Sequence, residues 1–178
     1  MNDTVNRDPL AGRLWRIIYW GGAALLLALP ALAMQLTDEV NWGSEDFIFA
    51  GILFVAVGVA LEFTVRKSRD WSYRAAMLGF IGGTFLTFWV NGAVGIIGNE
   101  SLDINTTFNV MALAGVLAAF VVRAQAGKMM AIAGVQALVV LATGFAAEFT
   151  SQPDWGPVLV FAAGWLVVTL MFRAARQD

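Results

Sequence analysis

Three polar side chains stand inside stretches of the chain that are otherwise apolar, namely Glu62, Asn91 and Gln136. A carboxylate or an amide in hydrocarbon needs a partner, because an unpaired polar group there costs several kcal/mol. Such residues often mark the route of an ion or a proton through a membrane protein. If their helices turn these faces inward, the three side chains could line one path for protons, cations or small solutes.

Each of the three residues also has a structural interpretation. Glu62 precedes Arg66 by one helical turn near the end of its apolar stretch, so the two can form an ion pair at the membrane interface. Asn91 lies about 10 Å from the outer end of its stretch at 1.5 Å per residue. An interhelical hydrogen bond would satisfy its amide, and the same holds for Gln136. We therefore expect structural partners first and a polar path second.

Small and polar residues recur at every fourth position in the third apolar stretch: Gly79, Gly83, Thr87, Asn91, Gly95 and Asn99. In an α-helix this spacing places side chains along one face. Small residues let a second backbone approach closely, and such packing holds helices together in lipid. The sequence thus predicts a buried packing face on the helix that carries them.

The elements that position these residues are six apolar stretches separated by polar breaks. They cover residues 14–36, 47–65, 75–97, 106–122, 129–147 and 155–172. A helix needs about 20 apolar residues to cross a bilayer, and the fourth and sixth stretches reach that length only with interfacial residues such as Thr106 and Trp155. Of the 178 residues, 59% are hydrophobic and 13% charged. This composition predicts an all-α integral membrane protein, a single domain of six transmembrane helices.

Charge divides the loops between these stretches into two classes. All 11 lysines and arginines lie at the N-terminus, in the second and fourth loops, or at the C-terminus. The first, third and fifth loops carry acids instead, namely Asp38, Glu39, Glu45, Asp46, Glu100, Asp103, Glu148 and Asp154. Because basic loops stay in the cytoplasm, we expect both termini to be cytoplasmic. The acids would then raise the local cation concentration at the outer face.

The third loop places oxygen-bearing side chains at every second position from Asn99 to Asn105, a spacing that faintly resembles a calcium-binding loop. The glycine that turns such a loop and its distal glutamate are missing. We therefore predict a solvated loop without a metal ion, in which Asn105 caps the fourth helix.

Two features leave alternatives open. The basic flank, the apolar run at 17–29 and the small residues at 31–33 imitate a cleavable signal peptide, but the run is longer than a typical signal core, which favours a retained helix. Asn41, Asn105 and Asp154 each precede an Ala-Gly pair by nine residues. This recurrence fits three helical hairpins descended from one, or the chance recurrence of caps and packing pairs.

Reactive chemistry is sparse in this chain, which contains neither cysteine nor histidine. Disulfides, thiolate nucleophiles, histidine acid–base catalysis and histidine-ligated haem or zinc are therefore excluded. Ser44, Ser68 and Ser101 lie in loops without a suitable base, and no P-loop or metalloprotease motif occurs. The net charge of -2 gives no reason to expect a nucleic-acid partner. We predict a protein that is not an enzyme and has no cofactor or metal.

Several motifs resemble an uncharacterised group of small multipass membrane proteins of bacteria. They are Met34–Trp42 with Asp46-Phe47, Tyr73-Arg74, and Trp89–Gly98 with Glu100. The resemblance covers roughly the first two thirds of the chain and implies a bacterial inner membrane location and no catalytic activity. It draws attention to the junctions at 39–46 and 91–100, which would form a polar cap over the outer end of the bundle if they pack together.

These observations predict a non-enzymatic membrane protein that acts through helix contacts, either as an accessory subunit or as a small self-associating scaffold. Its expected partners are the lipid bilayer and a protein or a second copy bound through small-residue helix faces. One alternative is a channel or transporter that uses Glu62, Asn91 and Gln136. A second alternative is a lipid- or quinone-binding protein.

Overall fold

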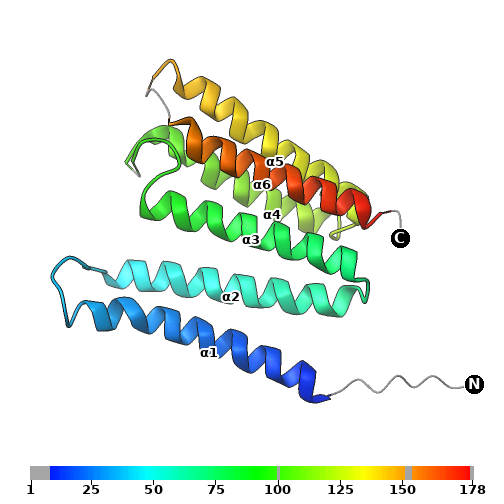
Figure 1. Cartoon of the computed structure of the whole chain (residues 1–178), viewed down its shortest axis with the longest axis horizontal. Coiled ribbons are helices and arrows are strands. Elements are labelled where there is room, and N and C mark those ends of the chain that lie inside the picture. Colours follow the sequence, from blue (N-terminus) through cyan, green and yellow to red (C-terminus); the bar gives the residue numbers. More distant parts are fainter. Residues whose placement is uncertain (1–8, 100, 151–153, 177–178) are drawn as a thin grey trace, which may run out of the picture. The chain divides into compact units, whose positions relative to one another are not determined.

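The computed structural model describes residues 9–99, 101–150 and 154–176, and this part of the chain is helical without a strand. The helices are α1 (Pro9–Ala33), α2 (Ser44–Lys67), α3 (Trp71–Ala93), η1 (Asp103–Asn105), α4 (Thr106–Val121), α5 (Ala126–Ala147) and α6 (Trp155–Ala174). Six segments are long and apolar enough to cross a membrane, the fourth with η1 included. The prediction of an all-α protein with six helices of transmembrane length is therefore confirmed (Figure 1).

The chain divides into two compact units, and the boundary falls within α2. Unit 1 comprises residues 1–60 and unit 2 comprises residues 61–178. That the six helices belong to a single membrane domain stays a prediction. Burial is concentrated in unit 2, since 6% of the α1 span is buried within the chain but 39% of the α3 span. A hairpin in lipid needs little burial of its own, because lipid tails are as apolar as leucine side chains.

In unit 1, aromatic side chains of α1 contact α2 at Phe54 and Gly58. The hydroxyl of Tyr19 donates a hydrogen bond to the carbonyl oxygen of Phe54 at 2.5 Å. Gly58 makes room for the aromatic rings of α1, because a Cβ at this position would lie 2.8 Å from the rings of Tyr19 and Trp20. The middle of α1 thus contacts α2 through the rings of Tyr19 and Trp20 and the hydroxyl of Tyr19.

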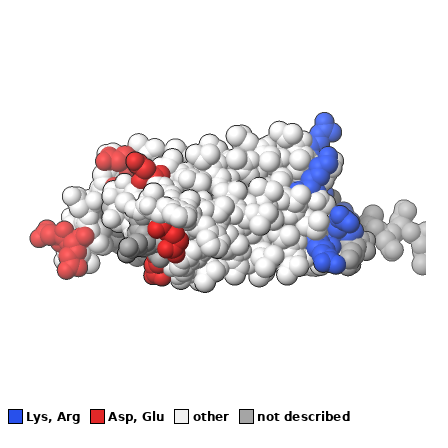
Figure 2. All heavy atoms as spheres, turned by 90° about the horizontal axis from the view of Figure 1, so that it is seen from above, with Lys and Arg blue, Asp and Glu red and all other residues white. Residues whose placement is uncertain are grey.

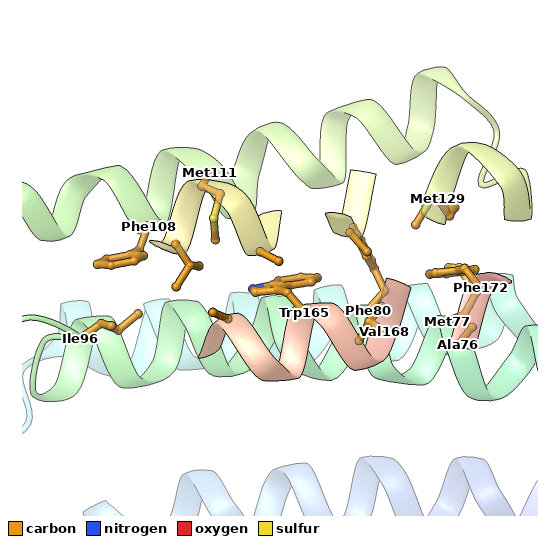
Figure 3. Packing of buried hydrophobic residues seen from close by; sticks show 14 of the residues in the cluster. Ala76, Met77, Phe80, Ile96, Phe108, Met111, Met129, Trp165, Val168 and Phe172 are labelled. Atoms are coloured by element: carbon orange, nitrogen blue, oxygen red, sulfur yellow. The ribbon is translucent and has the colours of Figure 1, made fainter. Parts of the chain in front are cut away.

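In unit 2, α3, α4, α5 and α6 form a closed ring in which each helix contacts the next and α6 contacts α3. Side chains fill the interior of this ring, and Trp165, Phe108 and Phe172 are fully buried there (Figure 3). The ring of Phe80 packs edge-on against Trp165 with centroids 5.5 Å apart. Unit 2 is therefore the part of the chain with a packed core.

The third helix is shorter than predicted. The sequence predicted helix to residue 97, but α3 ends at Ala93, and Gly95 adopts a φ of 77°, which glycine adopts at no steric cost. Ile96 and Ile97 are nevertheless buried, with 1% and 0% of their surface exposed. They belong to a loop that folds back onto the core, and apolar loop residues look like a continuing helix when hydropathy alone is considered.

Charged side chains gather at the helix ends in each unit (Figure 2). In unit 2 one end, called the acidic end, carries Asp103, Glu148 and Asp154. The opposite, basic end carries Arg66, Lys67, Arg69, Arg74, Arg123, Lys128, Arg173 and Arg176, together with the acids Glu62 and Asp70. In unit 1, Arg13 and Arg16 lie near the start of α1, and acids occupy the connection to α2.

Two connections at the basic end are fixed by side chains. The carboxylate of Asp70 accepts hydrogen bonds from the backbone N–H groups of Ser72 and Tyr73, and so caps α3. The hydroxyl of Tyr73 donates to the carbonyl oxygen of Ala124 at 2.8 Å, within the connection from α4 to α5. Ala124 has a positive φ of 48°, so this bond helps to hold a backbone conformation that alanine rarely adopts.

The three positions of the hairpin repeat have different local structures. Asn41 is exposed in a connection, and Asn105 is buried with 2% of its surface exposed. Asp154 caps α6 by accepting the backbone N–H of Gly156 at 2.9 Å. Descent from one hairpin stays a prediction.

Candidate functional site

The amide of Asn91 reaches the connection between α3 and α4. Its Nδ2 donates to the backbone carbonyl oxygen of Asn105 at 2.9 Å, and the side chain is 4% exposed. The Oδ1 of Asn91 has no hydrogen-bond partner among the described atoms. The amide of Asn91 therefore has a structural partner, but this partner lies in the connection that follows α3 rather than on another transmembrane helix.

Asn105 is the centre of this connection. Its Oδ1 accepts the backbone N–H groups of Ile96 and Ile97, at 3.2 and 3.0 Å. Its Nδ2 donates to the carbonyl oxygens of Ile97 and Asn99, at 2.9 and 2.7 Å. One side chain thus forms hydrogen bonds with four backbone groups of the loop after α3, which have no partners within a helix. The predicted helix-capping role of Asn105 is wrong, because its side chain makes no cap hydrogen bond to α4.

We call residues 94–99 and 101–105, with the side chain of Asn91, the clamped loop. Gly95 and Gly98 both have positive φ angles, of 77° and 65°, which let the chain turn back sharply. The buried side chains of Ile96, Ile97 and Phe108 then cover the acidic end of the core. Asn99, Ser101 and Asp103 stay exposed, as expected for a solvated loop, whereas Ile96 and Ile97, which precede them, are buried against the core.

Gln136 lies deeper in unit 2, beside Gly115 of α4. Its side chain is 2% exposed, and Nε2 has no hydrogen-bond partner in the part of the chain that the structure describes. A Cβ at Gly115 would overlap Nε2 and would lie 3.7 Å from Cζ of Phe80. The amide therefore occupies the space that the missing side chain of Gly115 leaves.

Glu62 forms the ion pair that its spacing predicted. Its Oε1 accepts a hydrogen bond from Nε of Arg66 at 2.6 Å, one turn along α2. The side chain of Arg66 is 75% exposed and that of Glu62 is 23% exposed. An ion pair with one open partner contributes little to stability.

The three polar candidates have separate surroundings in the structure. Phe80, which lies beside the amide of Gln136, is about 16 Å from Asn91 along α3 at 1.5 Å per residue. The interior between them holds the ring of Trp165, which packs over Gly83. The structure places no direct contact between Asn91 and Gln136, and the described contacts form no continuous polar path.

The small residues of α3 lie where α6 packs. A Cβ at Gly79 would meet Val168 at 3.0 Å, and one at Gly83 would meet the ring of Trp165 at 3.3 Å. Thr87 is fully buried, and its hydroxyl donates to the carbonyl oxygen of Gly83 at 2.8 Å. Gly95 was predicted on the same face, which is wrong because α3 ends before it.

The acidic side chains are spread over several connections. Glu39 and Glu45 are exposed in unit 1, and Asp46 accepts the backbone N–H of Gly43 at 2.9 Å. Asp103 is exposed in η1, whereas Glu100 lies outside the described residues. Within the described ranges no three acids gather into a group that could hold a metal ion.

Two important residues were missed or undervalued in the sequence. Asn105 appeared only as a helix cap, although an asparagine after the apolar pair Ile96-Ile97 and two turning glycines could have indicated a loop clamp. Trp165 is buried at the centre of unit 2, and its Nε1 has no hydrogen-bond partner within the described chain. Spacing alone does not reveal which of these side chains meet.

These surroundings favour packing over chemistry, since most of the polar candidates serve the fold. A comparison of the chain with protein-family models, with curated proteins and with solved structures finds no match.

Proposed function

We propose that this chain is a non-enzymatic membrane protein that acts through helix contacts, as an accessory subunit or as a self-associating scaffold. The observation that carries the proposal is the contrast between the two units. Unit 2 has a packed core, whereas α1 contributes a full span of which 6% is buried within the chain. A span with so little intramolecular packing is available to another helix.

The exposed side of α1 has the residues that such a contact needs. Gly21, Ala24 and Ala28 are exposed and lie on one side of the helix, which we call the open face of α1. Ala23 lies on the other side and is 6% exposed. Small residues let a second backbone approach closely in lipid. A Cβ added at Gly21 would meet no atom within 4 Å.

The interior of unit 2 supports a packing role more than a conducting one. The clamped loop covers its acidic end, and large side chains fill its centre. A channel would need a route past Ile96, Phe108 and Trp165, all of which are buried. The polar groups at Asn91 and Gln136 are separated by this packing.

The absence of cysteine from the chain permits a direct test of the open face. We expect Ala24→Cys and Ala28→Cys to form a disulfide-linked dimer in native membranes under mild oxidation, if the partner is a second copy. Ala23→Cys is the matched control and should stay monomeric on a denaturing gel, because its side chain is buried in the same helix.

The same variants distinguish the two forms of the proposal. If the partner is another protein, a bifunctional maleimide should link Ala24→Cys to a heavier product that mass spectrometry identifies. A bare monomer in native mass spectrometry, with no crosslinked product at either position, would contradict both forms.

We further propose that the chain lies in a bacterial inner membrane with both termini and the basic end in the cytoplasm. The support is the arrangement of charges, since basic connections stay on the cytoplasmic side. Ser44 is the first residue of α2, at its acidic end, and Ser68 directly follows α2 at its basic end. Cysteine is placed at each of these positions in turn, as Ser44→Cys and Ser68→Cys. In intact spheroplasts an impermeant maleimide should label the first variant and reach the second only after permeabilisation. Labelling of Ser68→Cys but not of Ser44→Cys in intact spheroplasts would show that the termini and the basic end lie outside the cytoplasm.

A further inference from the structure

We propose that unit 2 binds the headgroup of one anionic phospholipid with two phosphates, such as cardiolipin, at the basic end of α5 and α6. Three cations form this site, which we call the headgroup site: Lys128, Arg173 and Arg176. Lys128 lies in the first turn of α5 and Arg173 in the last turn of α6. The two helices pack antiparallel, so the start of α5 lies beside the end of α6.

The side chain of Arg176 reaches across from the end of α6 to α5. A Cβ added at Gly127 would lie 3.0 Å from Cδ and 3.7 Å from Nη1 of Arg176. The guanidinium group therefore lies beside the first turn of α5, where Lys128 directly follows Gly127. Arg173 precedes Arg176 by about one helical turn. Two helices thus bring three positive charges to one end of their shared surface.

No carboxylate compensates these three charges. Among the described residues none of the three cations has a hydrogen-bond or ion-pair partner. In residues 106–150 and 154–176 the acids are Glu148 and Asp154, and both lie at the acidic end. The acids of the basic end are engaged elsewhere, since Glu62 pairs with Arg66 and Asp70 caps α3. Like charges this close repel each other, and a bound anion would remove that repulsion.

Apolar side chains next to the cations favour a lipid over a soluble anion. On α6, Leu170 and Leu166 follow Arg173 toward the middle of the helix at spacings of three and four, and they are 52% and 54% exposed. On α5, Val135 lies two turns after Lys128 on the same side and is 58% exposed. Each helix thus presents a cation at its end and, in line with it, side chains that face hydrocarbon. An anion attached to acyl chains matches both features.

The number of cations favours a headgroup with two phosphates over one. A single phosphodiester carries one negative charge, which would leave most of the positive charge of the headgroup site uncompensated. Each lysine or arginine near the bilayer surface raises the affinity for anionic lipid about fivefold. A second phosphate allows the cation of α5 and the cations of α6 to be bound at the same time.

Native mass spectrometry of the full chain tests the proposal. The protein is delipidated in neutral detergent and supplied with equal amounts of cardiolipin, phosphatidylglycerol and phosphatidylcholine. We expect one cardiolipin retained per chain, with phosphatidylglycerol bound about fivefold more weakly and phosphatidylcholine more weakly still.

Charge-removing variants locate the site. Lys128→Gln, Arg173→Gln and Arg176→Gln should each lower the affinity for cardiolipin about fivefold. Arg173→Lys keeps the charge and should retain most of the affinity. Arg69→Gln is the matched control and should leave the affinity unchanged. Arg69 is exposed at the same basic end, but it precedes α3, which lies across the ring from α5. Circular dichroism confirms that each variant is folded.

Three results would overturn the proposal. They are equal retention of the three lipids, an equal loss of affinity in the Arg69→Gln and Arg176→Gln variants, and displacement of cardiolipin by an equal amount of inorganic diphosphate. The last result would assign the site to a soluble anion. Failure here is distinguishable from failure of the helix-contact proposal, because the open face of α1 belongs to unit 1. Crosslinking through Ala24→Cys should therefore not change when Arg173 or Arg176 is replaced.

Discussion

Replacing Asn105 by alanine is expected to lower the free energy of unfolding of this protein by about 3–5 kcal/mol, because it leaves several buried backbone groups unpaired at once. The side chain accepts two backbone N–H groups and donates to two carbonyl oxygens, and it is 2% exposed. Water cannot replace these bonds while Ile96 and Ile97 stay buried. The clamped loop should therefore detach before unit 2 unfolds.

Hydrogen exchange measures the detachment of the clamped loop, and denaturant titration in detergent measures the unfolding of unit 2. In the Asn105→Ala variant the amides of Ile96 and Ile97 should exchange much faster, while amides in the centre of α5 keep their protection. Asn105→Asp keeps the acceptor oxygen but sets a carboxylate oxygen against the carbonyl oxygens of Ile97 and Asn99 in a buried site, so it should destabilise the loop at least as much as alanine does.

Asn99→Ala provides the matched control for the clamp. Asn99 is exposed in the same loop, and its Oδ1 accepts from the backbone N–H of Ser101 at 3.1 Å. Water can replace that bond, so the loss should stay within about 0.5–1 kcal/mol. Equal effects of the two alanine substitutions would show that the clamp does not hold the loop.

The sequence predicts the helices well because lipid imposes a strict rule on the backbone. Each span must satisfy its own N–H and carbonyl groups, so a long apolar stretch in this chain has to be a helix. The six stretches and the four-residue spacing of Gly79, Gly83 and Thr87 follow from that rule. The ion pair of Glu62 with Arg66 follows equally from spacing on one helix.

Features that depend on contacts distant in the sequence were not predictable in the same way. Ile96 and Ile97 look like the end of a helix because they are apolar, yet they are apolar because a folded loop buries them. The role of Asn105 depends on that loop returning to the helix end. The division into two units depends on how much each hairpin buries, which hydropathy does not report.

The contacts of the candidate site residues also could not be predicted from the sequence. Asn91 and Gln136 were recognised as buried amides, but their neighbours come from other helices. The contact of Gln136 with Gly115 joins α5 to α4, and no spacing within either helix indicates it. Only the packed structure shows that the amide fills a glycine gap rather than facing a second polar group.

Gly115→Ala is expected to lower the free energy of unfolding by about 2–3 kcal/mol, although alanine is the better helix former by about 1 kcal/mol. The added Cβ would overlap Nε2 of Gln136 and lie 3.1 Å from its Cδ, with Phe80 behind it. Because Gln136 is 2% exposed, its amide has no open space to move into. Gly164→Ala in α6 is the control, since a Cβ there meets nothing within 4 Å, and it should not destabilise the protein.

Combining Gly115→Ala with Gln136→Ala tests whether the amide is the cause. Gln136→Ala removes the group that the new Cβ would strike, so the double variant should be about as stable as Gln136→Ala alone. The two changes should then be non-additive by about 2–3 kcal/mol in a double-mutant cycle, which is the whole effect of Gly115→Ala. Strict additivity would mean that the strain at Gly115 has another source, and that Gln136 is free to turn elsewhere. A polar path through unit 2 would require that freedom, so the same cycle weighs the packing role of Gln136 against a conducting one.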